Sequence, residues 1–169
     1  LHKHRRRQRQ MCIRDSGLGS GSLKPINANH DTEYHSSSVY GGSFDYQWPL
    51  SSWLSTSLMV HESGGEGSMP TKSEYKYYKS GIIGLQLKIW MGPLYLGVHG
   101  GQYYLTWIES MSAYSGIQQA GGSGYSIGFE TSSGWFLAAF SDQSETFSFD
   151  EMPDQQLEGN RVMLGYRWK

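Results

Sequence analysis

Apolar and polar residues alternate with a period of two along most of the chain from Val39 to Trp168. The segment 81–90 shows the pattern most clearly, since aliphatic residues alternate with small or polar ones: Ile83, Leu85, Leu87 and Ile89 against Gly84, Gln86 and Lys88. Strict alternation is typical of a β-strand with one apolar face and one polar face. The sequence therefore predicts an all-β protein.

Similar runs recur along the chain, over residues 39–48, 54–61, 94–99, 125–130, 136–140 and 161–168. In the run 136–140 the apolar face consists of Phe136, Ala138 and Phe140. Between Gly100 and Tyr103 the parity changes, because the apolar residues Tyr103, Leu105 and Trp107 occupy the opposite register to Leu94, Leu96 and Val98. An extra residue in a strand produces such a change, so we predict a β-bulge there.

Connections between these runs alternate in length, with tight turns near 50, 92 and 133 and longer polar loops near 63–76, 110–121 and 150–160. The glycine-rich segment 121–124 is interpreted as flexible loop. No apolar run approaches the roughly 18 residues of a membrane helix, and a spanning protein without one must be a closed barrel. We predict an up-and-down antiparallel transmembrane β-barrel of eight strands, with seven whole strands and a truncated first strand at 17–23.

Five of the six tryptophans lie close to a tight turn or to the last residue of the sequence: Trp48, Trp53, Trp90, Trp135 and Trp168. The indole ring is amphipathic and settles where hydrocarbon meets headgroups, so these residues predict an aromatic girdle at one membrane face. By strict parity Trp53, Trp90 and Trp135 point inward, which leaves open that they fill one end of the barrel instead.

Residues 1–16 match the translation of a transposase sequencing adapter, with Met11 to Ser16 derived from its mosaic end. We therefore predict that 1–16 are not part of the fold, that 17–169 form the barrel domain, and that the signal peptide is missing. A basic nucleic-acid arm or a signal-peptide n-region is the rival interpretation, but no apolar segment follows Arg14.

The charge balance changes when residues 1–16 are set aside. The whole chain carries 14 lysine and arginine residues against 15 aspartate and glutamate residues. Residues 1–16 hold six of the former and one of the latter, so residues 17–169 carry eight and 14, a formal charge of −6. A negative domain has no phosphate-binding footprint, so we expect no nucleic-acid partner. Cys12, the only cysteine, also falls in the excluded segment.

From residue 17 to 169 the chain resembles the small eight-stranded outer-membrane β-barrel proteins of Gram-negative bacteria. The resemblance is carried by the strand alternation, the turn asymmetry, the hairpin 40–60 and the final Gly165-Tyr166-Arg167-Trp168, although Lys169 follows the terminal aromatic. It implies a location in the outer membrane with lipid around the barrel, short turns in the periplasm and long loops outside. It also implies that the barrel assembly machinery recognises the last strand.

On that orientation a second, outer aromatic girdle is predicted, consisting of Tyr75, Tyr77, Tyr78, Tyr103, Tyr104 and Trp107. The long loops would contact any extracellular ligand. The polar residues assigned to the inner face by parity are Asp45, Gln86, Lys88, His99, Glu130, Arg161 and Arg167. An eight-stranded barrel is barely wider than its own side chains, so we expect these groups to pair and fill the lumen.

The expected role is structural or surface-interacting, without enzymatic activity, cofactor or metal. Three alternatives remain: a narrow passive pore, a soluble lipocalin-like ligand carrier with its apolar face inside, and an esterase. The esterase hypothesis rests on His61-Glu62-Ser63, which resembles the His-x-Ser arrangement of outer-membrane lipid A deacylases, with Glu66 or Glu74 as the third group. Gly64 replaces the asparagine of that family.

Overall fold

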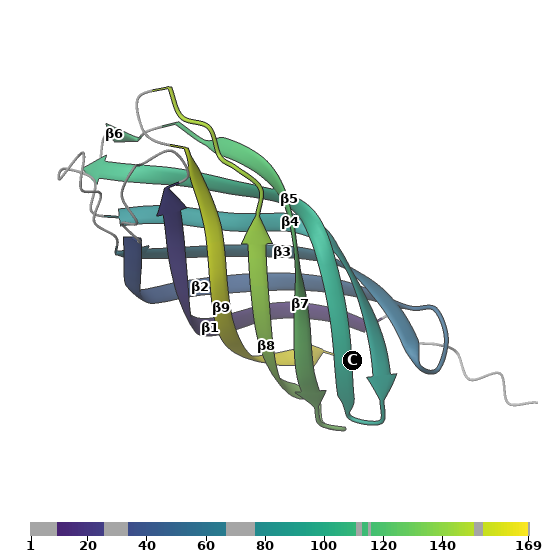
Figure 1. Ribbon diagram of the computed structural model, residues 1–169. Coiled ribbons are helices and arrows are strands. Elements are labelled where there is room, and N and C mark those ends of the chain that lie inside the picture. The colour runs from purple at the N-terminus through teal and green to yellow at the C-terminus, as the bar shows by residue number, and fades with distance from the viewer. Residues whose placement is uncertain are drawn as a thin grey trace, which may run out of the picture.

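The computed structural model describes residues 10–25, 34–66, 77–110, 113–114, 116–150 and 154–168, and side chains within 41–66, 77–108, 116–150 and 154–167. Figure 1 shows long, tilted strands arranged around one axis. The strands are β1 (Gln10–Pro25), β2 (Tyr34–Pro49), β3 (Leu54–Glu66), β4 (Tyr77–Met91), β5 (Leu94–Ser110), β6 (Ala113–Tyr114), β7 (Gln118–Glu130), β8 (Trp135–Ser144) and β9 (Gln155–Trp168). None of the described residues forms a helix with the length and apolarity needed to span a membrane.

Eight of these strands close into one antiparallel barrel. Each long strand, including β4 with β5, pairs with the next long strand in the chain, and one further pairing, of the first strand β1 with the last strand β9, closes the sheet on itself. The short β6 pairs only with the end of β5. The predicted all-β, up-and-down, eight-stranded architecture is confirmed. The strand β1 begins at Gln10, upstream of the expected start at 17, and the assignment of residues 1–16 stays a prediction.

One end of the barrel carries the tight turns, and we call it the short-turn end; the opposite end is the long-loop end. The backbone of the turns extends the barrel hydrogen bonding, since Trp90 N donates to Trp53 O at 2.8 Å and Arg167 N donates to Gly134 O at 2.7 Å. Gly134 (φ 100°) turns the chain from β7 into β8 in a conformation that L side chains rarely adopt. The glycine-rich segment 121–124 lies inside β7, so its interpretation as a loop is wrong.

The predicted bulge near Gly100 is also wrong. β5 pairs with β4 on one side and with β7 on the other, and neither register shifts between Leu94 and Leu105. Tyr103 and Trp107, only 1 % and 0 % exposed, keep the inward parity of Tyr95 and His99. The alternation continues without interruption, and it is the polarity of the interior that changes along the strand.

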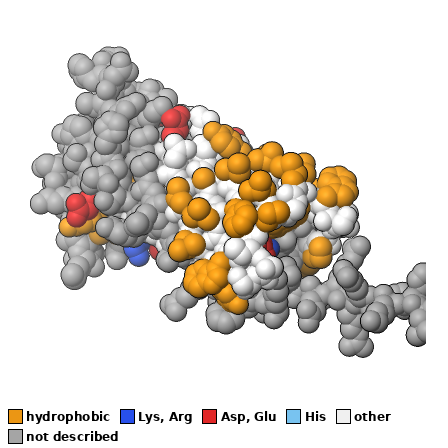
Figure 2. Space-filling view, turned by 90° about the horizontal axis from the view of Figure 1, so that it is seen from below, with side chains coloured by type: hydrophobic (Ala, Val, Ile, Leu, Met, Phe, Trp, Pro, Cys, Tyr) orange, Lys and Arg blue, Asp and Glu red, His pale blue; other side chains and the backbone are white. Residues whose placement is uncertain are grey.

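In the half of the barrel nearer the short turns, aliphatic side chains face outward. Leu85 is 61 % exposed and Val98 is 60 % exposed, and Figure 2 shows hydrophobic side chains spread across the middle of one face. On β4 this outward row runs from Ile83 to Met91, about 20 Å along the barrel axis at 3.3 Å per residue and a tilt near 40°. In β8 the inward residues are Phe136 and Ala138 and the outward one is Leu137, so the predicted outer face of that strand is inverted.

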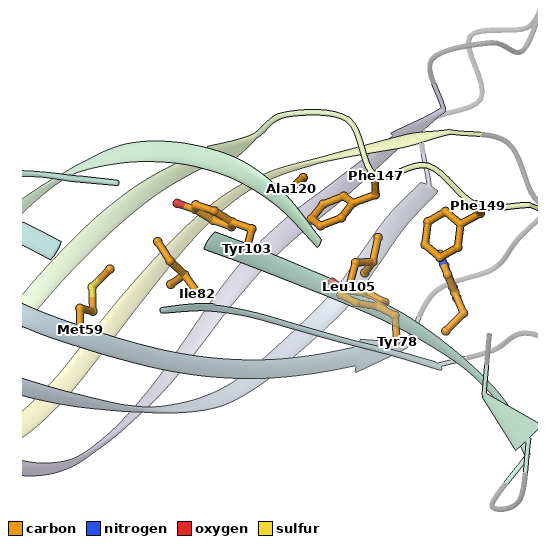
Figure 3. Packing of buried hydrophobic residues seen from close by; sticks show 9 residues of the cluster. Met59, Tyr78, Ile82, Tyr103, Leu105, Ala120, Phe147 and Phe149 are labelled. Atoms are coloured by element: carbon orange, nitrogen blue, oxygen red, sulfur yellow. The ribbon is translucent and has the colours of Figure 1, made fainter. Parts of the chain in front are cut away.

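Toward the long-loop end, the interior holds a cluster that we call the apolar plug: Met59, Tyr78, Ile82, Tyr103, Leu105, Trp107, Ala120, Phe147 and Phe149. Two of its members, Phe147 and Phe149, come from the connection between β8 and β9, which folds into the barrel (Figure 3). Backbone hydrogen bonds hold this connection, since Phe147 N donates to Gln155 O at 2.8 Å and Gln155 N donates back at 3.0 Å.

Large inward residues of β5 fit over glycines of β7. A methyl group built on Gly122 would lie 2.6 Å from the ring of Tyr103, and one built on Gly128 would overlap the ring of Tyr95. Glycine inside a strand often marks such a close approach. The glycines of β7 therefore provide the space in which the rings of β5 pack.

The variant Gly122→Ala is expected to destabilise the barrel by about 1–3 kcal/mol, because its methyl group forces the ring of Tyr103 out of place. Gly100→Ala is the matched control on the neighbouring strand, where the nearest atom to the new methyl group is the carbonyl oxygen of Gly122 at 3.3 Å. Urea unfolding from lipid vesicles, followed by tryptophan fluorescence, measures both. Equal stability of the two variants would contradict this packing.

Candidate functional site

The polar site lies in the lumen between the short-turn end and the apolar plug, and it begins with an ion pair between β4 and β2. Lys88 donates to Asp45 and lies 3.4 Å from Gln47 Oε1. The ammonium group also lies 5.2 Å from the ring centre of Tyr95, within the range of a cation–π contact. Lys88 is almost fully buried, so its charge depends on these partners.

A second ion pair lies nearer the short turns. Arg167 of β9 donates to Glu130 of β7, and its guanidinium carbon lies 5.6 Å from the ring centre of Trp90. The indole nitrogen of Trp90 donates to Ser55 Oγ at 2.8 Å. The side chains of Arg167, Glu130 and Ser55 and the half-buried ring of Trp90 fill the lumen near the turns.

The third ionic group surrounds Asp142 of β8 at the base of the apolar plug. Its Oδ1 lies 2.7 Å from His99 Nε2 and accepts a hydrogen bond from Tyr103 Oη at 3.0 Å. Its Oδ2 lies 2.8 Å from Arg161 Nη1. The guanidinium group of Arg161 also covers the ring of Phe140 at 4.8 Å. One carboxylate thus joins side chains from two other strands, with Arg161 on β9 and with His99 and Tyr103 on β5.

Sequence reasoning missed Asp142, although it joins two of the predicted lumen residues. The signal was available, because Asp142 has the same parity as Phe136 and Ala138. It was lost when that row was assigned to the outer face. Of the other predicted lumen residues, Gln86 donates to Ser126 Oγ at 2.7 Å.

A cavity of about 20 Å³ lies between the ionic groups, enough for roughly one water molecule. Its lining includes His61, which is 3 % exposed and whose ring nitrogens have no hydrogen-bond partner among the described residues. Asp45 Oδ1 and Arg161 Nε, from two other lining residues, also have no such partner. The cavity therefore has polar groups for one bound water and no space for a larger solute.

The His61-Glu62-Ser63 segment does not assemble a catalytic triad. Ser63 Oγ lies 3.1 Å from Ser80 Oγ, while both ring nitrogens of His61 are without a partner. The side chain of Glu62 is exposed and pairs with Lys79 at 3.7 Å. A serine nucleophile needs its base within hydrogen-bond reach and a carboxylate to orient that base, and neither contact exists among the described residues, which do not include Glu74.

The aromatic residues predicted at the membrane interfaces have different positions. Near the short turns, Trp53 and Trp135 are exposed, Trp48 is half-buried against Tyr46 with ring centres 4.6 Å apart, and Trp90 lies partly in the lumen. Tyr77 is exposed at the long-loop end. Tyr78, Tyr103 and Trp107 belong to the apolar plug, so their assignment to an outer girdle is wrong. Tyr75 and the side chain of Trp168 lie outside the described residues.

Across the described part of the chain, no group of three or more histidine, cysteine, aspartate or glutamate side chains is arranged to hold a metal ion. The lumen instead contains paired charges: Lys88 with Asp45, Arg167 with Glu130, and Arg161 with Asp142. Burial penalises ionised groups strongly unless they are paired and hydrogen-bonded. The arrangement therefore fills a narrow lumen and pairs each of these three cations with a carboxylate.

In the half of the barrel nearer the short turns, aliphatic side chains face outward and the ion pairs lie inside. A soluble carrier has the reverse arrangement, so the lipocalin-like alternative is wrong for this half of the barrel. Closed hydrogen bonding and outward aliphatic side chains define a transmembrane β-barrel.

Two solved structures have the same architecture. The crystal structure of Ail, the attachment invasion locus protein of Yersinia pestis, gives a TM-score of 0.61 at 10% identity and covers 95% of this chain and 100% of that chain. The crystal structure of Neisserial surface protein A gives 0.62 at 9% identity and covers 92% and 96%. No protein-family model and no curated protein matches the sequence. The chain has the fold of the small eight-stranded outer-membrane β-barrels of Gram-negative bacteria.

Removal of Lys88 is expected to destabilise the barrel strongly. Lys88→Met leaves the carboxylate of Asp45 buried without its cation, which costs about 3–5 kcal/mol. The matched control is Lys79→Met, in an exposed ion pair with Glu62, which changes stability by about 1 kcal/mol at most. Urea unfolding from vesicles measures both variants. A loss for Lys88→Met no larger than for Lys79→Met would show that the lumen pair is hydrated.

Proposed function

We propose that this protein is an integral outer-membrane barrel with a closed lumen, which serves a structural or surface-interacting role and catalyses no reaction. Its short-turn end faces the periplasm and its long-loop end faces outward. The observation that carries the proposal is the filled lumen: buried ion pairs occupy the half near the turns, and the apolar plug occupies the half near the loops. The outward aliphatic side chains and the fold support a place in the outer membrane.

The alternative function is a narrow passive pore. The small cross-section of the barrel argues against it. A solute would have to pass Lys88, Arg161 and Arg167, each held by a carboxylate, and then the rings of Tyr103 and Phe147. Eight-stranded barrels have an interior just wide enough for their own side chains. The cavity between the ionic groups does not change this, since it has room for about one water.

Planar-bilayer recording tests the closed lumen. The protein is expected to show no stable conductance steps at moderate voltage, because the ion pairs and the apolar plug leave no continuous aqueous path. Insertion is checked separately by a gel on which the unboiled barrel migrates differently from the boiled chain. Regular single-channel steps from protein that has passed this check would favour the pore.

The carboxylates near the long-loop end support a surface role. The three lumen cations face three lumen carboxylates, so these pairs contribute nothing to the formal charge of −6 carried by residues 17–169. Near the long-loop end, exposed or half-buried carboxylates include Glu62, Glu145 and Glu158. We propose that a partner at this end is neutral or basic, because an acidic surface repels polyanions.

This point separates the protein from one structural neighbour. Ail of Yersinia pestis was crystallised in complex with the heparin analogue sucrose octasulfate, in a structure that matches this chain with a TM-score of 0.51 at 11% identity. We expect no saturable binding of sucrose octasulfate by the present protein at physiological ionic strength, as measured by calorimetry in detergent. A triple variant, Glu62→Lys, Glu145→Lys and Glu158→Lys, is the control that should gain binding. Tight binding by the unmodified protein would contradict the charge argument.

Two proposals concern the ends of the chain. Residues 17–169 constitute the barrel domain, and the last strand β9 (Gln155–Trp168), with alternating Val162, Leu164 and Tyr166, is the element that the barrel assembly machinery recognises. The alternation and the pairing of β9 with both β8 and β1 support this role, since β9 lies where the sheet closes.

A further inference from the structure

The polarity of the wall reverses along single strands. On β4, the outward residues between Ile83 and Met91 are apolar while Gln86 and Lys88 point inward; nearer the loops, Lys79 is outward while Tyr78 and Ile82 are inward. On β5, the outward row Leu94, Leu96 and Val98 gives way to Gln102, and the inward row changes from Tyr95 and His99 to Leu105 and Trp107. The register is continuous in both strands.

The outward part of this change also occurs on the adjoining strands, although the inward row of β8 runs the other way, from Phe136 and Ala138 near the turns to Asp142 and Ser144 nearer the loops. Outward Tyr125 of β7 is followed toward the loops by Ser123, outward Ala139 of β8 by Gln143, and outward Val162 of β9 by Asn160. An exposed ion pair, Lys79 with Glu62, lies on the outside of β3 and β4 beyond Val60 and Ile83. We call this outer part of the wall the collar, defined by Glu62, Lys79, Gln102, Ser123, Gln143 and Asn160.

A polar outside and an apolar inside are what water requires of a β-barrel. Moving apolar groups out of water lowers the free energy. Moving them from lipid tails to an equally apolar protein interior changes the free energy little. The apolar plug lies inside the collar, while below it, where the outside is aliphatic, the interior holds the ion pairs beside a smaller apolar cluster of Tyr95, Phe136 and Ala138. Each half therefore has the side-chain distribution of a different solvent.

We infer that the collar stands outside the hydrocarbon, in the polar headgroup layer of the outer leaflet and the water beyond it. There it extends the barrel and has the apolar plug as its own hydrophobic core. The membrane boundary passes between Val98 and Gln102 on β5 and between Tyr125 and Ser123 on β7. From Gln102 to Ile108 the wall rises about 15 Å at 3.3 Å per residue and a tilt near 40°. Amide and hydroxyl side chains of the collar are suited to hydrogen bonds with headgroup sugars and phosphates.

The inference rests on the proposed membrane location and adds a boundary within it. Tyr77 lies beyond Lys79 on β4 and is exposed. On this boundary, Tyr77 projects from the collar above the hydrocarbon, so it is not a residue of the predicted outer girdle. The long loops then begin above the lipid surface on a rigid base.

Single cysteines in a Cys12→Ser background test the boundary. Three pairs of exposed positions, each on one strand, compare a collar position with a belt position, by which we mean an outward position in the aliphatic half of the barrel. The pairs are Gln102→Cys with Val98→Cys, Ser123→Cys with Ile127→Cys, and Gln143→Cys with Leu137→Cys. Each variant is labelled in urea with an environment-sensitive fluorophore, then folded into phosphatidylcholine vesicles. Collar positions should emit as in water and react with an aqueous quencher, and belt positions should shift to shorter wavelength and be quenched by brominated lipid.

The outcomes separate the two levels of the proposal. Lipid quenching at all six positions would overturn the collar while leaving the membrane barrel in place. Aqueous emission at all six would overturn the membrane location itself. The expected result is at least a tenfold difference in aqueous quenching rate within each pair. Emission from the urea-unfolded variants, which should be the same at all positions, is the control for the label.

Discussion

The closed ring of backbone hydrogen bonds is the constraint on which the rest of the structure depends. Hydrocarbon offers no partner for an unpaired amide, so a sheet that crosses a membrane must have no edge. Here the pairing of the first strand β1 with the last strand β9 removes both edges. Once the ring is closed, every second side chain faces a space of fixed and small width. The identity of each inward residue is then limited by what its neighbours across the lumen leave free.

That limit explains the composition of the interior. Where Lys88, Arg161 and Arg167 point inward, a carboxylate from another strand meets each of them. Where the rings of Tyr95 and Tyr103 point inward, the facing positions of β7 are glycines. The interior is thus complementary in charge and in size. It is less complete around the small cavity, where His61 and one oxygen of Asp45 have no hydrogen-bond partner in the described part of the chain.

The sequence was sufficient for the architecture because alternation and turn length are local properties. The row Ile83 to Ile89 and the Gly92-Pro93 turn could be assigned without knowledge of any partner strand. Face assignment was less secure, because alternation does not say which parity is inside. It succeeded where one row was aliphatic and the other charged, and it failed for Phe136 and Ala138, and for Tyr103 and Trp107, where apolar residues point inward. Asp142 was missed for the same reason, since its row had been placed outside.

The apparent irregularity at Gly100 carries information about the surroundings of the barrel. A uniform solvent would have produced one apolar row along the whole of β5; the exchange of rows at constant register reports two solvents along one strand. The position along the strand at which the apolar row changes sides thus indicates where the hydrocarbon ends.

The pairing of charges in the lumen has an electrical consequence. A membrane voltage does work only when net charge moves through the field, at about 2.3 kcal/mol per elementary charge for each 100 mV. Lys88, Arg161 and Arg167 are each tied to a carboxylate, so their formal charges cancel within the wall that holds them. Among the described lumen residues, no lysine or arginine is therefore free to move as a gating charge when the potential changes.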